Sequence, residues 1–122
     1  MCGAEAQFEI EYQGVDPLRN VHISMAFLDV YGDGVLYLSN DIAGCSFERI
    51  AAVGSLVCKF ERLPLLPGSY TVNLYCTVNG IQADWVRDAA RVNIENGDFY
   101  GSGKLPPAGY GSVAVAHDWI AK

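Results

Sequence analysis

Strict alternation of apolar and polar residues restricts the fold of this chain more than any other feature. The clearest run is SYTVNLYCTVNG, residues 69–80, in which every second side chain from Tyr70 to Val78 is apolar. The side chains between them carry hydroxyl, amide or phenol groups. A period of two places the two sets on opposite faces of a β-strand, one toward a core and one toward water. The run therefore predicts a half-buried antiparallel strand that ends at the tight-turn pair Asn79-Gly80.

The same alternation recurs along the chain and predicts an all-β fold. Turns such as YGDG and PLLPG separate the runs. The stretch 43–55 admits a short helical turn, and 81–90 is ambiguous between a short strand and a helical turn. Seven or eight short strands without a long helix predict a two-sheet antiparallel β-sandwich, with a small closed barrel as the alternative. The firmest strand predictions are residues 6–12, 21–30, 35–41, 56–63, 69–80, 90–96 and 112–120.

Composition limits the classes of partner. The chain has 122 residues, 51% of them hydrophobic, and a formal net charge of −6 with only eight Lys and Arg residues. That length predicts a single domain, 1–122, with its own core, and the hydrophobic content argues against disorder. The acidic balance argues against a nucleic acid partner and against an anionic membrane surface. No run is long enough to span a bilayer and no signal peptide is recognisable, so we expect a soluble domain.

The four cysteines predict no zinc site, because none of them forms a CxxC pair. Cys58 and Cys76 both lie in the apolar phase of predicted strands and would be nearly opposite each other if those strands formed a hairpin. The favoured interpretation is two buried thiols in a reducing compartment, and a disulfide is the alternative.

No grouping of residues predicts catalysis, a cofactor or a metal site. His22 and His117 are the only histidines, and neither lies in a motif with a nucleophile or a metal ligand. GSGK at 101–104 resembles a phosphate loop only superficially, because Asp98 replaces its first glycine and Leu105 replaces its Ser or Thr. Three aspartates around the YGDG turn could bind calcium, although turn aspartates more often cap their own backbone. These are Asp29, Asp33 and Asp41.

The polar face of the strand at 69–80 is the first candidate binding surface. It carries Asn73, Tyr75 and Thr77 and no formal charge. Such a face suits a sugar, which presents hydroxyl groups at its rim and an apolar C–H face that can lie on an aromatic ring. Ordinary solvated sheet faces carry the same residue types, so the pattern alone leaves both interpretations open.

Aromatic residues elsewhere extend that candidate site. Trp85 lies in ADWVRD between Asp84 and Arg87, in a predicted turn at an end of the sandwich, and is the leading candidate for a ring that contacts a ligand. Most other aromatic residues are expected to pack in the core or at strand edges. The predicted carbohydrate-binding residues are Tyr37, Asn73, Tyr75, Thr77, Asp84, Trp85 and Arg87.

Several segments together resemble the C-terminal domain of Wzt, the ATPase subunit of the ABC transporter that exports O-antigen polysaccharide in Gram-negative bacteria. They are FEIEY, LDVYGDGVLYLSND, LPLLPGSYTVNLY, ARVNIENGDFYGSG and AVAHDW, and they extend from Phe8 to Trp119. The most specific are the L-x-x-G-x-Y entry into the strand at 69–80 and the tail from GDFYGSG to HDW. The motif G-x-x-x-x-G-K-[ST] of the ATPase is missing, so the chain is either an excised domain or a stand-alone relative.

The resemblance implies a fold, a ligand and an assembly. The fold would be an immunoglobulin-like antiparallel β-sandwich without enzymatic activity. It would bind the finished polysaccharide in the cytoplasm, at the inner face of the inner membrane, and pass it to the transporter subunits. The assembly would be a homodimer that exchanges C-terminal strands. Individual ligand residues do not carry over, because binding surfaces in this family follow each strain's glycan.

The end of the chain is consistent with such an exchange. Residues 97–111 are rich in glycine and contain Pro106-Pro107, which predicts an extended arm with unusual backbone angles. The arm would carry the strand predicted at 112–120 to a sheet edge of its own or of a second protomer, where residues 112–119 would pair.

Two other functions compete with a carbohydrate-binding module. One is a structural dimerisation module of a polysaccharide-related enzyme or transporter, whose polar face is merely solvated. The other is a sugar-modifying enzyme, which is disfavoured because a hydrolase usually needs paired acids in a cleft. Asp84 and Asp88 lie close together in a predicted turn and are better explained as solubilising charges.

Overall fold

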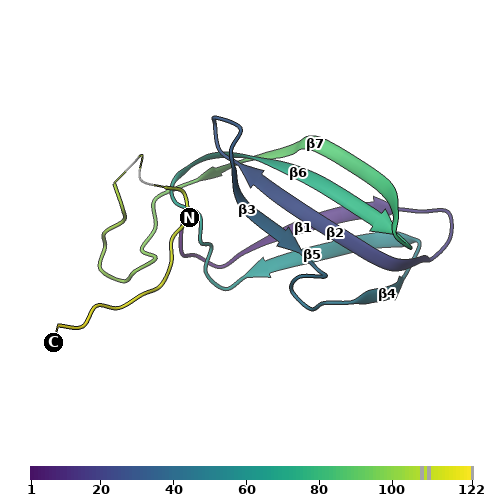
Figure 1. Ribbon diagram of the computed structural model, residues 1–122, viewed down its shortest axis with the longest axis horizontal. Coiled ribbons are helices and arrows are strands. Elements are labelled where there is room, and N and C mark those ends of the chain that lie inside the picture. Colours follow the sequence, from purple (N-terminus) through teal and green to yellow (C-terminus); the bar gives the residue numbers. More distant parts are fainter. Residues whose placement is uncertain (108, 110, 122) are drawn as a thin grey trace.

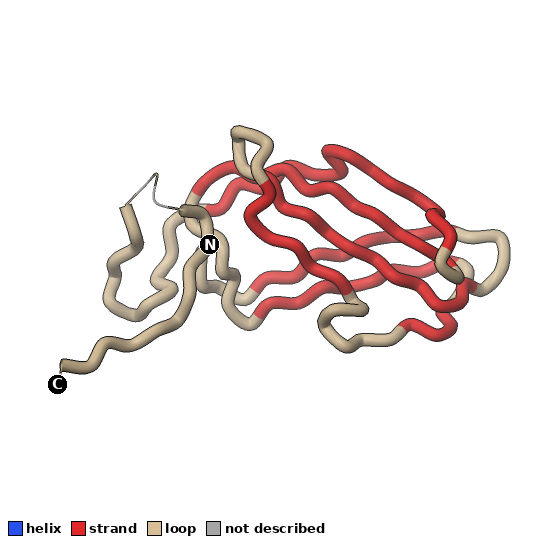
Figure 2. Tube along the Cα trace, in the orientation of Figure 1, coloured by secondary structure: helices blue, strands red, loops and turns tan. Residues whose placement is uncertain are grey.

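Two antiparallel sheets pack face to face (Figure 1). The computed structural model describes residues 1–107, 109 and 111–121, and the side chains of residues 84, 85 and 88 also lie outside the description. The front sheet has the order β3-β2-β6-β7, with β4 paired to the beginning of β2, and the back sheet consists of β1 and β5. The described residues contain seven strands and no helix (Figure 2). The strands are β1 (Ala6–Gln13), β2 (Leu18–Leu28), β3 (Gly34–Ser39), β4 (Phe47–Ile50), β5 (Val53–Phe60), β6 (Gly68–Val78) and β7 (Ile81–Ile94).

The predicted all-β sandwich is confirmed, and alternation explains its core. The apolar phases of β2 and β6 face inward, and the register sets Phe27 opposite Val72 and Met25 opposite Leu74. Phe27 is fully buried, and its ring meets Phe8 of the back sheet edge to face at 5.3 Å. These contacts tie the two sheets together through buried apolar area and aromatic packing.

One end of the sandwich is closed by segments that are far apart in sequence. The N–H of Cys2 donates to the carbonyl oxygen of Glu95 at 3.1 Å, and the Cys2 side chain is 1% exposed. A Cβ on Gly97 would overlap the carbonyl oxygen of Cys2, so the close approach requires glycine there. Phe99 is buried in the same core as Cys2. We call this end of the molecule the end cap.

Residues 112–114 complete the end cap. Val113 forms an isolated antiparallel bridge with Leu65, and the N–H of Leu66 donates to the carbonyl oxygen of Ser112 at 2.8 Å. Ala114 is 3% exposed and belongs to the core cluster. Beyond it the chain extends away from both sheets (Figure 1), and residues 115–121, which we call the tail, are exposed.

The L-x-x-G-x-Y segment forms a tyrosine corner at the start of β6. The hydroxyl of Tyr70 donates to the carbonyl oxygen of Leu66 at 2.6 Å, four residues earlier. Immunoglobulin-type sandwiches use such a bond to fix the entry of a strand. Burial raises the pKa of the Tyr70 phenol, which keeps the hydroxyl protonated as the donor.

Two stretches that the sequence left open are assigned by the sheets. Within 43–55, Phe47–Ile50 form β4 against β2. The nearest helix-type hydrogen bond, from the N–H of Ala43 to the carbonyl oxygen of Ser39 at 3.0 Å, belongs to the turn that precedes this strand. Residues 81–90 belong to the long strand β7, so of the two alternatives the strand is correct and the helical turn is wrong. Its alternation was obscured by a register shift: between the pairs Val72–Ala90 and Leu74–Val86, β6 advances two residues and β7 four. A bulge of this kind interrupts the period of two that identifies a strand.

Two further predictions depend on which strands pair. Cys58 lies in β5 opposite Phe8, whereas Cys76 lies in β6 opposite Ile23, so the two thiols belong to different sheets and the hairpin that would bring them together does not form. All four cysteines are free, which agrees with the favoured interpretation and not with a disulfide. Within the protomer the segment 112–120 pairs only through the bridge of Val113, and the pairing of residues 112–119 with a second protomer stays a prediction. The N–H of Ala114 donates to the carbonyl oxygen of Pro64, and this is the last backbone hydrogen bond between the C-terminal segment and the β5–β6 connection among the described residues.

Candidate functional site

The outer surface of the front sheet, which we call the front face, brings most of the predicted binding residues together. In the register, Tyr37 on β3 is opposite Ala26 on β2, and Ala26 is opposite Asn73 on β6. One step along, Ser24 on β2 is opposite Tyr75 on β6. Cross-strand neighbours on one face have Cβ atoms about 5 Å apart. Four of the seven predicted residues, Tyr37, Asn73, Tyr75 and Thr77, thus share one face.

The front face has small side chains in its middle and aromatic side chains on either side. Ser24 is only 8% exposed, although it lies in the outward phase of β2. Tyr37 and Tyr75 remain 60% and 39% exposed on the neighbouring strands. Each tyrosine is opposite a small residue of the central strand. Its ring therefore projects further from the sheet than the side chain beside it.

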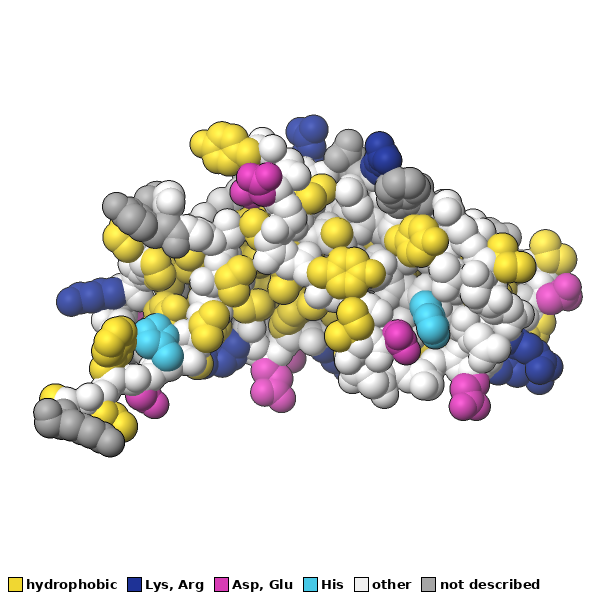
Figure 3. Space-filling model, in the orientation of Figure 1, with side chains coloured by type: hydrophobic (Ala, Val, Ile, Leu, Met, Phe, Trp, Pro, Cys, Tyr) yellow, Lys and Arg dark blue, Asp and Glu magenta, His cyan; other side chains and the backbone are white. Residues whose placement is uncertain are grey.

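Charge is sparse on this face. Figure 3 shows hydrophobic side chains, tyrosine included, gathered along the middle, with acidic and basic side chains mostly around the rim. The polar groups around the rings are mostly hydroxyls and amides, from Ser24, Ser39, Asn73 and Thr77, and the imidazole of His22 lies opposite Thr77. Hydroxyl and amide groups both donate and accept hydrogen bonds, which matches the donor and acceptor pattern of sugar hydroxyls.

The predicted turn around Trp85 is wrong, because residues 84–87 lie within β7. The register sets the backbone of Trp85 opposite Tyr75 and that of Asp84 opposite Cys76. The side chains of Trp85 and Asp84 lie outside the described residues, so their predicted roles stay predictions. Arg87 is exposed on the same edge strand, at the bulge.

Two cavities lie at the borders of the front face, the first lined in part by Tyr37 and Ser39 and the second in part by Ser69. The flank cavity, of about 520 Å³, opens between β3 and β5 and is lined mainly by apolar residues of both sheets, such as Met25, Leu38 and Leu56. Cys58 also lines it, and burial, with a smaller effect of the nearby Cys45 thiolate, raises the pKa of the Cys58 thiol. The end cavity, of about 480 Å³, lies beside the end cap.

The comparison with known families decides the family. The model of the Wzt C-terminal domain family matches residues 1–105. The chain belongs to the Wzt C-terminal domain family. A solved structure described as the crystal structure of the C-terminal domain of Wzt has a TM-score of 0.59 and 11% identity, over 97% of this chain and 69% of that one. At such low identity the likeness shows the shared fold. No curated protein sequence matches the chain significantly.

In this Wzt-family domain the carboxylate of Asp29 at the YGDG turn binds backbone N–H groups of the turn itself. The Oδ1 atom of Asp29 accepts hydrogen bonds from the N–H groups of Tyr31 and Asp33, at 2.9 and 3.0 Å. That carboxylate therefore caps its own turn. The described residues contain no group of three or more His, Cys, Asp or Glu side chains that could hold a metal ion. They also contain no helix long and apolar enough to cross a membrane.

Sequence reasoning missed two parts of the Wzt-family surface. Ser24 and Ala26 form the middle of the front face, and the outward phase of β2 could have shown it once β2 was paired with β6. The end cavity was also missed, because its walls come from three separate segments: the β2–β3 turn, the entry to β6, and the arm at 97–111 with the residues flanking it. No local sequence pattern predicts that these three segments lie close together.

Proposed function

We propose that this Wzt-family domain binds O-antigen-type polysaccharide on its front face and presents it to the ABC transporter that exports the polymer. Family membership supports the role in that transporter. The observation that carries the ligand class is the front face itself: tyrosines beside small residues, among hydroxyl and amide groups. The domain acts without catalysis, in the cytoplasm at the inner face of the inner membrane.

The physical basis is a match between the face and a sugar polymer. Tyr37 and Tyr75 offer ring surface to the apolar C–H faces of sugar rings, and burial of that area favours binding. Asn73 and Thr77 offer hydrogen bonds to the hydroxyl groups at the rims. Few of the described side chains in the middle of the face carry a fixed charge, so binding there needs no charged group on the glycan.

The direct test is isothermal titration of the domain with O-polysaccharide released from the lipopolysaccharide of the source bacterium. Tyr37→Ala and Tyr75→Ala should each weaken binding about tenfold, which corresponds to about 1.4 kcal/mol for a ring with its hydrogen bond. Val57→Ala is the matched control, because Val57 is 46% exposed on the back sheet. Equal affinities for all four proteins would exclude the front face as the site.

We also infer that the tail joins two copies of the chain. Val115, Trp119 and Ile120 are 60%, 90% and 83% exposed, although they lie in or beside an alternating run that suits a strand. A free strand of this kind lowers its free energy by pairing with an open sheet edge. Because Ser112 and Ala114 bond to the β5–β6 connection, the exchanged segment begins after Ala114.

The alternative function, a dimerisation module without glycan contact, makes a separable prediction. It requires the tail but not the tyrosines of the front face. If Tyr37→Ala and Tyr75→Ala bind glycan normally while removal of the tail abolishes dimers, the structural function stands and the glycan site on this face does not.

A further inference from the structure

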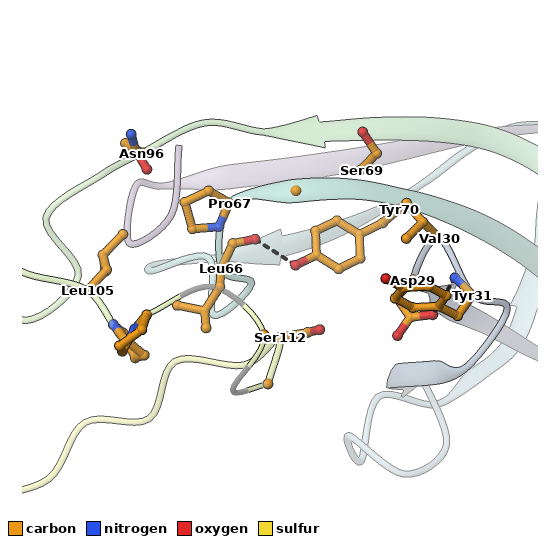
Figure 4. A pocket seen from close by; sticks show the side chains of 15 residues that line it. Asp29, Val30, Tyr31, Leu66, Pro67, Ser69, Tyr70, Asn96, Leu105 and Ser112 are labelled. Carbon is orange, nitrogen blue, oxygen red and sulfur yellow. Dashed lines mark hydrogen bonds between the residues drawn. The ribbon is translucent and has the colours of Figure 1, made fainter.

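The end cavity is enclosed by three segments that meet only in the folded chain. They are the β2–β3 turn at 29–31, the entry to β6 at 66–70, and parts of 96–112 that include the Pro106-Pro107 pair. In Figure 4 the turn residues lie on one side of the cavity and Leu105 lies on the other. A volume of about 480 Å³ falls within the range of small-molecule sites.

Several polar groups of this cavity are not used by the fold. The hydroxyl of Tyr70 is used, because it donates to Leu66. By contrast, the turn employs only Oδ1 of Asp29, and no described residue hydrogen-bonds its Oδ2 atom or the side-chain amide of Asn96. Ser69 donates its single hydroxyl proton to Asn93 at 2.7 Å and keeps acceptor capacity. These groups supply acceptors and donors to a hydroxylated ligand.

The charge and apolar surfaces of the cavity narrow the ligand class. Asp29 contributes a negative charge, and no Lys or Arg is among the described residues that line the cavity. A carboxylate or phosphate on the ligand would therefore be repelled, whereas hydroxyl and ammonium groups can donate to Asp29. The Tyr31 ring is 86% exposed and the two prolines add apolar surface, which suits the C–H face of a sugar ring.

We propose that the end cavity is a second saccharide-binding subsite, selective for uncharged or amino sugars over acidic sugars. It rests on the proposed function, because it extends the same polymer site. Ser69 lines the cavity and lies in the same outward phase of β6 as Thr71, Asn73 and Tyr75. Four residues of strand separate Ser69 from Asn73 by about 14 Å, so one oligosaccharide can contact both places.

The test is chemical-shift mapping of backbone amides with simple methyl glycosides as probes. Neutral glycosides of glucose, galactose, mannose and rhamnose, methyl glucosaminide and methyl glucuronide are each titrated into the domain. At least one neutral or amino glycoside should shift the amides of Asp29, Tyr31 and Asn96, and the glucuronide should not. No shift there with any neutral or amino probe, or an equal shift with the glucuronide, would overturn the subsite.

Two variants sharpen the test. Tyr31→Ala removes an exposed ring and should weaken the responding glycoside about tenfold. Asp29→Asn retains an Oδ1 acceptor for the turn but loses the charge, so it should reduce the discrimination against glucuronide. Val15→Ala, at a residue 98% exposed in the β1–β2 loop, is the control. It should leave the affinity for the glycoside and the discrimination against glucuronide unchanged. If Asp29→Asn discriminates as well as the native domain, the assignment of selectivity is wrong.

Failure of this subsite is distinguishable from failure of the front face. Tyr37→Ala should weaken the polymer without altering shifts at Asp29 and Tyr31 caused by a methyl glycoside. Shifts confined to Asn73, Tyr75 and Thr77 would leave the front face intact and exclude the cavity. Shifts confined to the cavity would exclude the front face instead.

Discussion

The arm at 97–111 and the tail at 115–121 are neighbours whose sequences and structures are mismatched. The arm has the irregular composition of a loose loop, yet Phe99 is 5% exposed and Leu105 packs against the core. The tail continues a regular alternating run, yet Val115 and Trp119 are exposed. Long-range partners decide the outcome: Phe99 of the arm packs in the core with Cys2, whereas residues 115–121 pair with no strand of the protomer. A strand pattern without a partner strand is only a capacity to pair.

The largest predicted difference between the arm and the tail is tested by Phe99→Ala. Loss of a buried aromatic ring leaves a cavity and should lower the free energy of unfolding by about 3–5 kcal/mol. Val115→Ala, at a residue 60% exposed in the tail, should change it by less than about 0.5 kcal/mol. Urea denaturation followed by tryptophan fluorescence measures both. Similar values for the two variants would mean that the arm is not anchored as described.

Tyr70→Phe tests the link between the tyrosine corner and the end cap. The substitution leaves the carbonyl oxygen of Leu66 without its 2.6 Å donor in a buried place. The free energy of unfolding should fall by about 1–3 kcal/mol. A loss below about 0.5 kcal/mol, measured by the same urea denaturation, would show that this bond does not hold the entry to β6.

The same residue predicts a response to alkaline pH. Burial raises the pKa of Tyr70 above its ordinary value of about 10. The protonated phenol therefore contributes stability that is complete below pH of about 10 and is lost as pH rises through the folded-state pKa. Thermal melts of native protein and Tyr70→Phe should converge above that pH. Parallel curves up to pH of about 12 would contradict the assignment.

Deletion after Ala116 separates stability from assembly. Because the bonds at Ser112 and Ala114 remain, the free energy of unfolding of the protomer should change by less than about 0.5 kcal/mol. The dimer inferred for the native chain should be lost, as measured by light scattering coupled to size exclusion. A deletion after Asn96 would be uninformative, since it also removes Phe99 and Ala114 from the core. A stable dimer of the shorter chain would end the exchange model.

The smallest predicted effect concerns the one hydrogen bond between arm and tail that involves Tyr100. Its hydroxyl oxygen accepts the N–H of Val115 at 3.2 Å in an exposed position. Tyr100→Phe should lower the free energy of unfolding by no more than a few tenths of a kcal/mol. Amide exchange at Val115 should nevertheless become faster. Unchanged exchange would indicate that the tail is held by something other than Tyr100.

Much of the fold could be predicted because alternation is local information. Strands β1, β2, β3 and β6 follow from period-two runs, whereas the bond of Tyr70 to Leu66 was found only in the structure. β7 could not be read in full, since bulges are created by pairing with β6. The pairing of Cys58 could not be read either, because it depends on which sheet β5 joins.

The candidate site also contains one part that local sequence predicts and another that depends on which strands and segments come together. Asn73, Tyr75 and Thr77 alternate along one strand, so their common face was visible in the sequence. Tyr37 joined them only when β3 was paired to β2. The end cavity depends on residues 29–31 and 96–112 meeting around the entry to β6, which is a property of tertiary structure alone.

The end cap also sets an order of events during folding. Its bonds join Cys2 to Glu95 and Leu66 to Ser112, so most of the chain must be synthesised before the cap can close. Closing such long loops is slow compared with pairing neighbouring strands. The tail follows directly after Ala114 in the chain. A nascent protomer therefore completes its own core at almost the moment when its tail first becomes available to a second copy.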